Sequence, residues 1–293
     1  MPPFKRSLQI TILAANLLLI SFLSAAQKHY KVPVTQKDWS RDYRPFCIAG
    51  NLYYVGTYDL ACYLITTPQG HILINTGLAE SAPMIRKHVE ALGFKFSDIK
   101  ILLATHAHYD HVGAMAQIKK MTGAKMMVNE NEAAVLADGG KSDYAMGGKG
   151  PLFEPVKADG LLHDRDTVSL GGMQLLAMHH PGHTKGATSF LFDVTDENRT
   201  YRVLIANMPS VIVDTLSGNP RYPGIIKDYA YTFAALKNLK FDIWLSSHAS
   251  QFGLHDKHGP GDGYHPGKFI DRPGYDAEVN NLEKEYLKKV ENN

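Results

Sequence analysis

The motif HAHYDH at residues 106–111 constrains this chain more than any other stretch, because it places three histidines and one carboxylate within six positions. The apolar run at 99–104 before it has the length and branched side chains of a buried strand, and the residues from 112 onward have a helical pattern. We therefore expect the motif in a loop between a buried strand and a helix. Such loops carry the functional residues of many α/β proteins.

These four side chains have the chemistry and the spacing of metal ligands. His106 and His108 are two residues apart, so in an extended loop they point to the same side and can share one ion. Asp110 and His111 lie one helical step further on and can reach a second ion. Imidazole nitrogen and carboxylate oxygen both suit zinc. The alternative is a surface turn in which Asp110 only caps the next helix, but so many ligands directly after a buried strand favour the metal site.

Residues 1–26 have the pattern of a secretory signal peptide. Lys5 and Arg6 form a positive start, residues 8–23 are mostly apolar, and Ser24-Ala25-Ala26 is a small-residue cleavage site. The apolar run is a little short for a membrane span, so an uncleaved anchor is the lesser alternative. We predict a periplasmic protein in which residues 27–293 form a single domain, with no stable membrane association after cleavage.

Charge and cysteine content narrow the possible partners. The chain has 31 basic and 29 acidic residues, and two of the basic ones lie in the signal segment, so the remainder is balanced. This balance gives no electrostatic footprint for nucleic acid or a membrane surface.

Export makes a disulfide between Cys47 and Cys62 possible, whereas their apolar neighbours are equally compatible with two buried thiols. The sequence leaves these two states open.

Strand and helix patterns alternate through both halves of the chain, roughly 46–165 and 166–293, which predicts two sheets sandwiched between helices. The expected strands are 51–55, 62–66, 71–74, 99–104, 125–128, 167–170, 173–178, 188–192, 202–205 and 241–245. The expected helices are 79–92, 112–118, 129–136, 228–239 and 276–290. Residues 138–151 have no periodicity, and an irregular segment of that length inside a compact domain is usually functional or mobile.

Two further histidines follow expected strands and complete the ligand set. His183 lies in the sequence HPGHT at 180–184, where the Pro-Gly turn fixes the loop, and His248 follows the strand at 241–245. We expect His179 and His180 to pack against their strand, and His255 is the one rival to His248. His258 and His265 lie with His255 in a Gly/Pro-rich tail, and the histidines expected at the surface are His29, His71, His88 and His163.

The motifs HAHYDH, PGHT and SSHASQFGL, together with INTG and IANMPS, resemble the metallo-β-lactamase superfamily and within it the B3-type β-lactamases, the GOB type above all. The resemblance covers roughly residues 45–260. It implies an αββα sandwich of two mixed β-sheets flanked by helices, and two zinc ions per chain. The first zinc would be bound by His106, His108 and His183, and the second by Asp110, His111 and His248. GOB-type enzymes characteristically have glutamine at the position of His106, so the histidine here implies a three-histidine first site.

The resemblance also implies a function. It implies a monomer that hydrolyses the amide bond of penicillins, cephalosporins and carbapenems through zinc-bound hydroxide, giving antibiotic resistance. Asp110 would be catalytic, both as ligand and as orienter of the nucleophile. B3-type enzymes hold the substrate carboxylate with serines after the strand at 203–206; here Met208 takes the first serine position and cannot donate a hydrogen bond, so binding would shift to Ser210. Further candidates for substrate contact are Asn207, Tyr144 and Trp39, although ordinary packing explains Met208 and Tyr144 equally well.

Two other functions compete with this hypothesis. The first is another hydrolase of the superfamily, a lactonase or a glyoxalase II-like thioesterase. Those enzymes typically place a metal-bridging aspartate where this chain has Met208, which argues against them. The second is a non-catalytic zinc-binding protein of the cell envelope, which would not require an Asp-His second site. Serine hydrolysis is disfavoured because the sequence has no G-x-S-x-G elbow.

Overall fold

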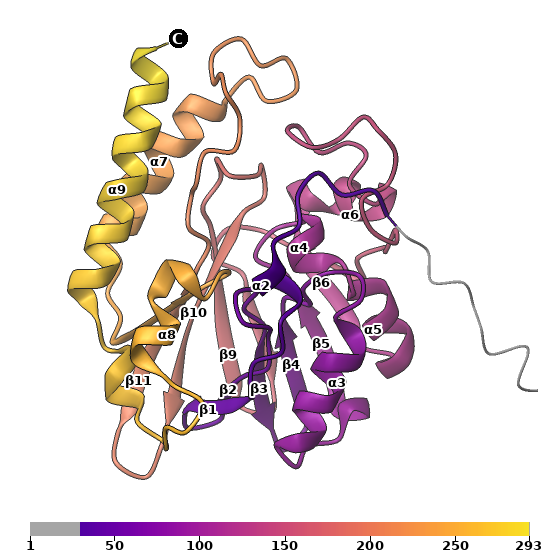
Figure 1. The fold of residues 1–293 in the computed structure, drawn as a ribbon, viewed down its shortest axis with the longest axis vertical. Coiled ribbons are helices and arrows are strands. Elements are labelled where there is room, and N and C mark those ends of the chain that lie inside the picture. The colour runs from indigo at the N-terminus through magenta and orange to yellow at the C-terminus, as the bar shows by residue number, and fades with distance from the viewer. Residues whose placement is uncertain (1–29, 293) are drawn as a thin grey trace, which may run out of the picture. The chain divides into compact units, whose positions relative to one another are not determined.

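A computed structural model describes residues 30–292, so the expected signal peptide at 1–26 and His29 lie outside the described residues. Within the described residues, the chain from Val32 onward forms one compact unit. This unit contains two β-sheets packed face to face, with helices on their outer sides (Figure 1). Both sheets are mixed, which confirms the expected α/β sandwich.

The first sheet has seven strands arranged in chain order. Its first four strands pair antiparallel, and β4, β5, β6 and β7 pair parallel. The hairpin between β3 and β4 turns at 68–69, as Pro68-Gln69-Gly70 predicts. The strands are β1 (Phe46–Ala49), β2 (Leu52–Tyr54), β3 (Tyr63–Thr67), β4 (Gly70–Ile74), β5 (Ile99–Leu103), β6 (Lys125–Asn129) and β7 (Gly160–Leu162).

The second sheet has five strands in the order β12-β11-β10-β9-β8, antiparallel except for the parallel pair β11 and β12. Alternation along the strands divides the buried side chains between two cores. Ile74 belongs to the core that includes Phe190 and Val203 of the second sheet, whereas its neighbour Leu73 packs with the helices outside the first sheet. The strands are β8 (Thr167–Leu170), β9 (Met173–His179), β10 (Thr188–Thr195), β11 (Thr200–Ala206) and β12 (Ile243–Ser246).

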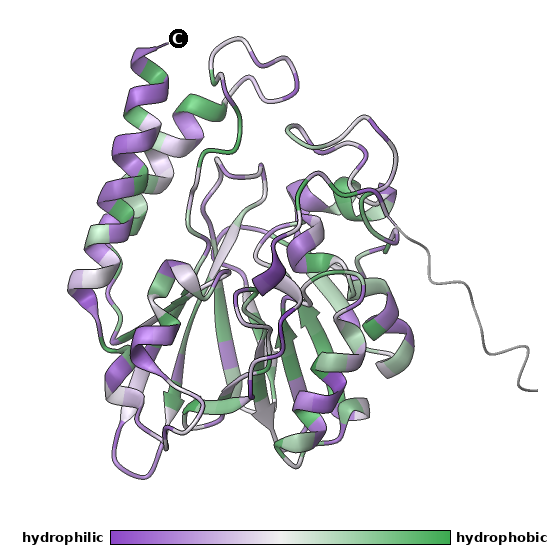
Figure 2. Cartoon of the chain, in the orientation of Figure 1, coloured by the Kyte–Doolittle hydropathy of each residue, from purple (hydrophilic) through white to green (hydrophobic). Residues whose placement is uncertain are grey.

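Amphipathic helices cover the outer faces of both sheets. Helices α3 and α5 lie outside the first sheet, and α7 and α9 lie outside the second (Figure 1). Hydrophobic residues concentrate on the strands and hydrophilic ones on helices and loops (Figure 2). Across the described residues, no helix is both long and apolar enough to cross a membrane. The helices are α2 (Lys37–Ser40), α3 (Ala82–Ala91), α4 (Tyr109–Val112), α5 (Met115–Thr122), α6 (Ala133–Asp138), α7 (Ile225–Lys237), α8 (Leu254–Lys257) and α9 (Arg272–Glu291), with 3-10 turns η1 (Phe96–Asp98), η2 (Glu130–Glu132), η3 (Ser250–Phe252) and η4 (Pro266–Phe269).

The helix expected after the HAHYDH motif is interrupted. It forms as α4 and α5, with Gly113 and Ala114 between them. Gly113 donates a backbone hydrogen bond to Gly77 at 2.9 Å, and a Cβ at this position would lie 2.5 Å from the backbone of Leu78. Glycine is therefore required for this close approach of two chain segments. The interruption leaves Asp110 and His111 on a separate short helical turn.

Two histidines expected at the surface are buried, so that prediction was wrong. His88 is 1% exposed on the inner side of α3, where its Nδ1 lies 3.0 Å from the carbonyl oxygen of Val55 and its Nε2 lies 2.7 Å from Asp42. His71 is buried in β4. A single histidine in an amphipathic pattern predicts an exposed polar side chain. His88 can be buried because both of its ring nitrogens have polar partners, which replace the lost contacts with water.

Candidate metal centre

Three histidines from two loops converge at one edge of the sandwich. His106 and His108 follow β5, and His183 follows β9 in the Pro-Gly loop. Each of the three offers a ring nitrogen, and these nitrogens lie within 4.8 Å of one another. All three side chains are buried, at 3%, 3% and 7% exposure. The sequence expectation that these residues meet is realised in the geometry, and the group could hold one metal ion.

A second group lies directly beside the first. It consists of Asp110, His111 and His248, whose ligating atoms also lie within 4.8 Å of one another. Oδ2 of Asp110 lies 3.2 Å from Nε2 of His111 and 3.4 Å from Nε2 of His248. The rings of His106 and His111 are 4.3 Å apart, so the two groups share a boundary. Each group supplies three ligands, which leaves room for a further ligand in a four-coordinate site.

Polar partners behind the histidines fix which nitrogen faces the centre. Nδ1 of His106 lies 2.7 Å from Oδ1 of Asn207, and Nδ1 of His183 lies 2.8 Å from the carbonyl oxygen of Ser210. Because both partners are acceptors, each Nδ1 carries the proton and each Nε2 keeps its lone pair. Nε2 of His106 is buried without a hydrogen-bond partner, as is Nδ1 of His111.

Two carboxylates that the sequence did not single out, half-buried Asp59 and buried Asp143, support the other histidines. Oδ2 of Asp59 lies 3.0 Å from Nδ1 of His248, and Oδ1 of Asp59 accepts a hydrogen bond from the Ser250 backbone at 2.9 Å. Oδ2 of Asp143 lies 3.3 Å from Nε2 of His108, within ion-pair distance but outside hydrogen-bond geometry. Asp143 belongs to the irregular segment 138–151, whose length was the one sequence signal for it.

Burial and neighbouring charges divide the ligand histidines, because three have a lowered pKa and the two that face carboxylates, His108 and His248, have a raised one. Burial lowers the pKa of His183 to about 3, and burial also lowers the pKa values of His106 and His111, so all three rings are neutral near pH 7. Burial lowers the pKa of His248 too, but hydrogen bonds to Asp110 and Asp59 outweigh it and raise this pKa to about 9. The two neighbouring histidines hold the pKa of Asp110 well below its usual range against the effect of burial, so this carboxylate is ionised.

The donor set fits a divalent transition metal. Five imidazoles and one ionised carboxylate are the ligand types that zinc binds. A buried Nε2 without a partner, as in His106, is costly in a protein interior unless something accepts its lone pair. A metal ion satisfies that lone pair, and the acceptor behind the ring already has the geometry that histidine ligands require.

The residues expected at the substrate fall into two kinds of environment. Met208 and Asn207 are buried, at 3% and 0% exposure, and Asn207 contacts His106 from behind. Tyr144 is 6% exposed, and its hydroxyl donates to the carbonyl oxygen of His183 at 3.1 Å. Ser210 is half-buried, with its Oγ 3.2 Å from Nδ1 of His183.

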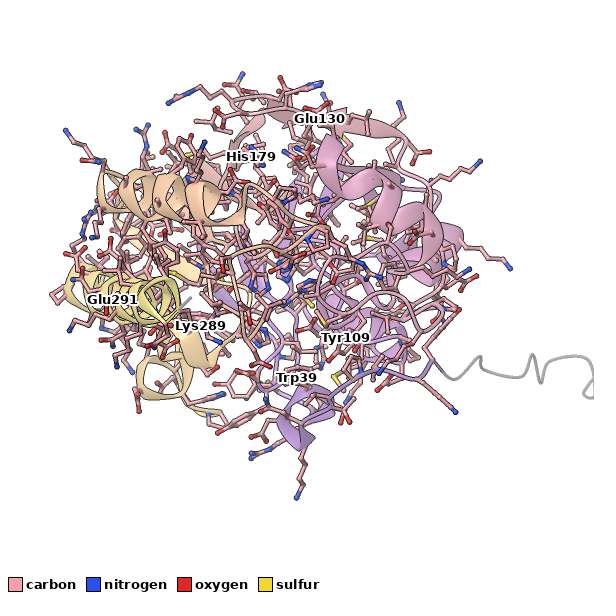
Figure 3. All side chains as sticks on the ribbon, turned by 90° about the horizontal axis from the view of Figure 1, so that it is seen from above. Trp39, Tyr109, Glu130, His179, Lys289 and Glu291 are labelled. Atoms are coloured by element: carbon pink, nitrogen blue, oxygen red, sulfur yellow. The ribbon has the colours of Figure 1, made fainter. Side chains whose placement is uncertain are left out.

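Trp39 comes from the amino-terminal segment and packs against the second group. Its ring centroid lies 5.7 Å from that of His248 and 6.3 Å from that of Tyr109, and its Nε1 donates to Asp59 at 3.1 Å. Figure 3 places Trp39 and Tyr109 next to each other. Trp39 therefore contacts the ligand His248 through its ring, and it contacts Asp59, which lies behind His248, through its indole nitrogen.

The remaining histidines lie outside both groups. His255 stacks on Tyr58 with 3.6 Å between ring centroids, and its Nε2 lies 2.8 Å from the Tyr58 carbonyl oxygen. His180 is buried with its Nδ1 2.8 Å from Ser189, whereas His179 is more exposed and contacts the Lys185 carbonyl.

Both cysteines, Cys47 and Cys62, are free thiols, which answers the open question of a disulfide.

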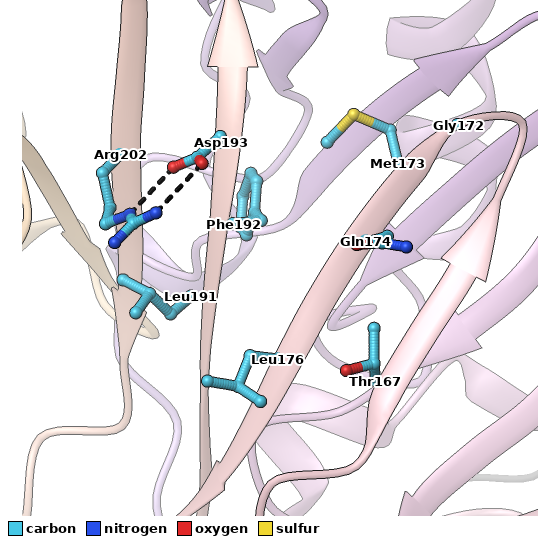
Figure 4. Close-up of a pocket in the computed structure, with 9 residues that line it drawn as sticks. All are labelled: Thr167, Gly172, Met173, Gln174, Leu176, Leu191, Phe192, Asp193 and Arg202. Atoms are coloured by element: carbon cyan, nitrogen blue, oxygen red, sulfur yellow. Dashed lines mark hydrogen bonds and ion pairs between the residues drawn. The ribbon is translucent and has the colours of Figure 1, made fainter.

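A separate hollow of about 360 Å³ lies on the second sheet (Figure 4). None of its lining residues belongs to the two ligand groups. Arg202 and Asp193, neighbours on β11 and β10, form an ion pair at one side of it, with Nε and Oδ1 2.9 Å apart. It has no cluster of metal-ligating or nucleophilic side chains. The lining residues are Thr167, Gly172, Met173, Gln174, Leu176, Leu191, Phe192, Asp193 and Arg202.

Comparison with known proteins places the chain in one family. A profile of the metallo-beta-lactamase superfamily matches residues 57–196. The class B3 di-zinc metallo-beta-lactamase LRA-12 from an Alaskan soil metagenome is 62% identical, with a TM-score of 0.88, and the match covers 89% of this chain and 99% of that one. GOB-18 from Elizabethkingia meningoseptica is 55% identical, with a TM-score of 0.89 and coverage of 91% and 99%.

Curated relatives match over a shorter region. A probable metallo-hydrolase of Burkholderia pseudomallei is 34% identical over 38% of this chain and 36% of its own length. A hydroxyacylglutathione hydrolase of Bradyrhizobium is 29% identical over 45% of this chain and 42% of its own length. The chain thus spans less than half the length of these curated relatives.

The chain belongs to the metallo-β-lactamase superfamily, and its structural neighbours, as metallo-β-lactamases, are hydrolases. Within the superfamily it belongs with the class B3 enzymes, because it is 55–62% identical to LRA-12 and GOB-18 over nearly their whole length. The resemblance that the histidine motifs suggested is therefore confirmed.

Proposed function

We propose that this protein is a zinc-dependent β-lactamase that opens the amide bond of β-lactam antibiotics. One observation carries the proposal: two adjacent ligand groups, His106/His108/His183 and Asp110/His111/His248, lie in a chain 62% identical to a class B3 di-zinc metallo-beta-lactamase. We propose penicillins, cephalosporins and carbapenems as substrates, and antibiotic resistance as the consequence for the cell. Each group would hold one zinc ion.

Zinc bound there would supply a Lewis acid and would lower the pKa of a coordinated water towards neutrality. The protein's own part is to hold lone pairs in place and to balance charge. The neutral rings of His106, His111 and His183 present lone pairs without first losing a proton. Asp110 brings the one ionised carboxylate among the six ligands, so we propose that it orients the nucleophile as well as binding metal.

Substrate contacts are proposed for two residues at the margins of the centre. Ser210 keeps a hydroxyl beside His183 and is half-buried, so it can donate to a substrate carboxylate. Trp39 contacts His248, and we propose that the 8% of its surface that stays exposed meets the apolar part of a substrate. Met208, Asn207 and Tyr144 are buried, so any effect on the substrate would be exerted through the loops that they support.

For cellular location we propose that residues 1–26 act as a signal peptide and that residues 27–293 form a single periplasmic domain. The proposal rests on the positive start, apolar core and small-residue end of the first 26 residues. Monomeric behaviour is proposed as well.

A thioesterase of the glyoxalase II kind is the second candidate, favoured by the match to hydroxyacylglutathione hydrolases. The ligand chemistry argues against it. Such enzymes resemble this centre but add a bridging aspartate where this chain has Met208. Within residues 30–292, the two ligand groups include one carboxylate, Asp110. Met208 is a buried core residue and offers no carboxylate oxygen.

A substrate panel separates these candidates. The purified protein loaded with zinc should hydrolyse a carbapenem, a penicillin and a cephalosporin, and should leave a glutathione thioester and a simple lactone essentially intact. His108→Ala or Asp110→Ala should largely abolish turnover while circular dichroism remains unchanged. Near-normal turnover by either zinc-loaded variant would contradict the site assignment. Thioester cleavage without β-lactam cleavage would favour the second candidate.

A further inference from the structure

We propose that Glu132 is a positioning residue for the three-histidine group. Its carboxylate bridges the backbones of the two loops that carry His106, His108 and His183, and thereby sets the separation of these ligands. The inference deepens the proposed metal centre and rests on it. Glu132 lies at the end of η2, three residues after β6, and belongs to none of the sequence motifs.

Both carboxylate oxygens of Glu132 are used, one on each loop. Oε2 accepts a hydrogen bond from the backbone N–H of Ala107 at 2.9 Å, and Oε1 accepts one from the backbone N–H of Gly186 at 2.7 Å. Ala107 stands between His106 and His108, and Gly186 follows His183 by three residues. The Glu132 side chain thus joins the two segments that must be held together to bring the three imidazoles within reach of one ion.

The topology explains why a residue after β6 can do this. Strands β5 and β6 are parallel neighbours, so they end at the same edge of the first sheet. The HAHYDH loop leaves β5 at that edge, and η2 leaves β6 beside it. The second loop is brought in by a backbone hydrogen bond from Thr188 to Thr105 at 2.8 Å.

Gly186 shows that the second loop is fitted closely to this carboxylate. A Cβ at Gly186 would lie 2.6 Å from Cγ of Glu132 and 2.9 Å from Oδ1 of Asn129. Glycine is therefore needed for the loop backbone to reach the carboxylate oxygen. This accounts for the last glycine of the segment HHPGHTKG, for which metal ligation gives no reason.

Because Glu132 is buried, its carboxylate needs both of these hydrogen bonds, and they must have good geometry. Glu132 is 1% exposed, and a buried carboxylate is tolerated only where hydrogen bonds replace its lost water. Charge-assisted bonds from two N–H groups meet that need and are geometrically strict. An amide at this position would present an NH₂ group to one of the two N–H donors. The expected result is a shift of one ligand loop relative to the other.

The test measures zinc affinity by competition with a chromophoric chelator in two full-length backgrounds. His248→Ala leaves the three-histidine group complete, and His183→Ala leaves the Asp110/His111/His248 group complete. Adding Glu132→Gln should lower zinc affinity about 10–100-fold in the His248→Ala background, the range typical for residues that support metal ligands. In the His183→Ala background the change should stay below about threefold.

Two further variants sharpen the result. Glu130→Gln is the matched control, because Glu130 is two residues away and half exposed, and its carboxylate pairs with His163 at 3.4 Å; it should change neither affinity. Glu132→Asp keeps the charge but is one methylene too short to span both loops. It should lower zinc affinity in the same background as Glu132→Gln, and only there.

Three outcomes would overturn the inference. Unchanged affinity of Glu132→Gln in the His248→Ala background would do so, as would an equal loss in both backgrounds, which would mean a general effect on the fold. Failure of both Glu132 variants to fold with zinc present would assign the residue to the fold alone. If the His248→Ala and His183→Ala parents bind no zinc, the proposed function fails, and this inference fails with it. If the parents bind zinc and Glu132→Gln has no selective effect, this inference alone fails.

Discussion

Removing the carboxylate of Asp59, which lies behind His248, should weaken zinc binding by the Asp110/His111/His248 group and leave zinc binding by the three-histidine group unchanged. Asp59 accepts hydrogen bonds from three donors, namely Nδ1 of His248 at 3.0 Å, Nε1 of Trp39 at 3.1 Å and the backbone N–H of Ser250 at 2.9 Å. Asp59→Asn keeps the shape, but it removes the charge and leaves one donor facing an NH₂ group. Asp59→Ala removes all three acceptors.

The magnitude follows from the bond to His248. A hydrogen bond to a charged group contributes about 1.5–3 kcal/mol, and its neutral counterpart contributes about half of that. Asp59→Asn should therefore lower the free energy of zinc binding by about 0.8–1.5 kcal/mol, or roughly 4–13-fold in zinc affinity. Asp59→Ala should cost about 1.5–3 kcal/mol, roughly 10–150-fold, which overlaps the range known for residues behind metal ligands.

The assay is competition for zinc in the His183→Ala background, at a pH above the value of about 9 that Asp110 and Asp59 give His248, so that protons do not compete. Asp38→Asn is the control, because Asp38 is 48% exposed and contacts Arg41 at 3.5 Å. Equal affinities for the parent and Asp59→Ala would refute the reasoning. A loss of the same size in the His248→Ala background would refute it too.

Three further predictions concern the core, a thiol and a ligand loop. Phe190→Ala empties a fully buried position between the sheets and should lower the free energy of unfolding by about 3–5 kcal/mol in urea denaturation; a loss below about 1 kcal/mol would contradict the packing described. Burial raises the pKa of Cys47 to about 11, so at pH 8 iodoacetamide should modify it about 100-fold more slowly than a free cysteine, and the rate should rise about tenfold per pH unit below pH 11. Gly182 has φ +132°, and a Cβ there would lie 2.8 Å from Tyr229, so Gly182→Ala should displace His183 and weaken zinc binding at least about tenfold, whereas Gly261→Ala, with open space around it, should not.

The ligand histidines could be found from sequence because their signals are local. HAHYDH sets four ligands within six residues, and His183 and His248 each follow an apolar run that ends in a short turn. Strand and helix periodicity likewise predicted the two-sheet sandwich, because each element buries one face. Prediction from periodicity fails where a tertiary contact determines the local structure. At Gly113, for example, the close approach of the backbone to Leu78 interrupts a helix.

The supporting carboxylates could not be found in this way. Asp59 is 189 residues from His248 in sequence, and Glu132 is 25 residues from Ala107 and 54 from Gly186. Each is a single acidic residue without a motif, and its role depends on which strands become neighbours. His88 illustrates the same limit, because its burial depends on Asp42 and Val55 meeting it across the fold.

These contacts give each ligand group its own support. Asn207, Asp143 and Ser210 contact the three histidines of the first group, whereas Asp59 contacts His248 in the second. Trp39 adds the amino-terminal segment to the second group through Asp59. Changes in that segment should therefore reach the Asp110/His111/His248 group first.

The central claim, that the six side chains form one hydrolytic zinc centre, is tested most directly by adding zinc to the metal-free protein while carbapenem hydrolysis is followed. We expect no turnover in the presence of chelator, recovery as zinc is added, and two ions bound per chain at full activity. Turnover that persists after both ions are removed would contradict it. So would a protein that binds two zinc ions and leaves every β-lactam intact.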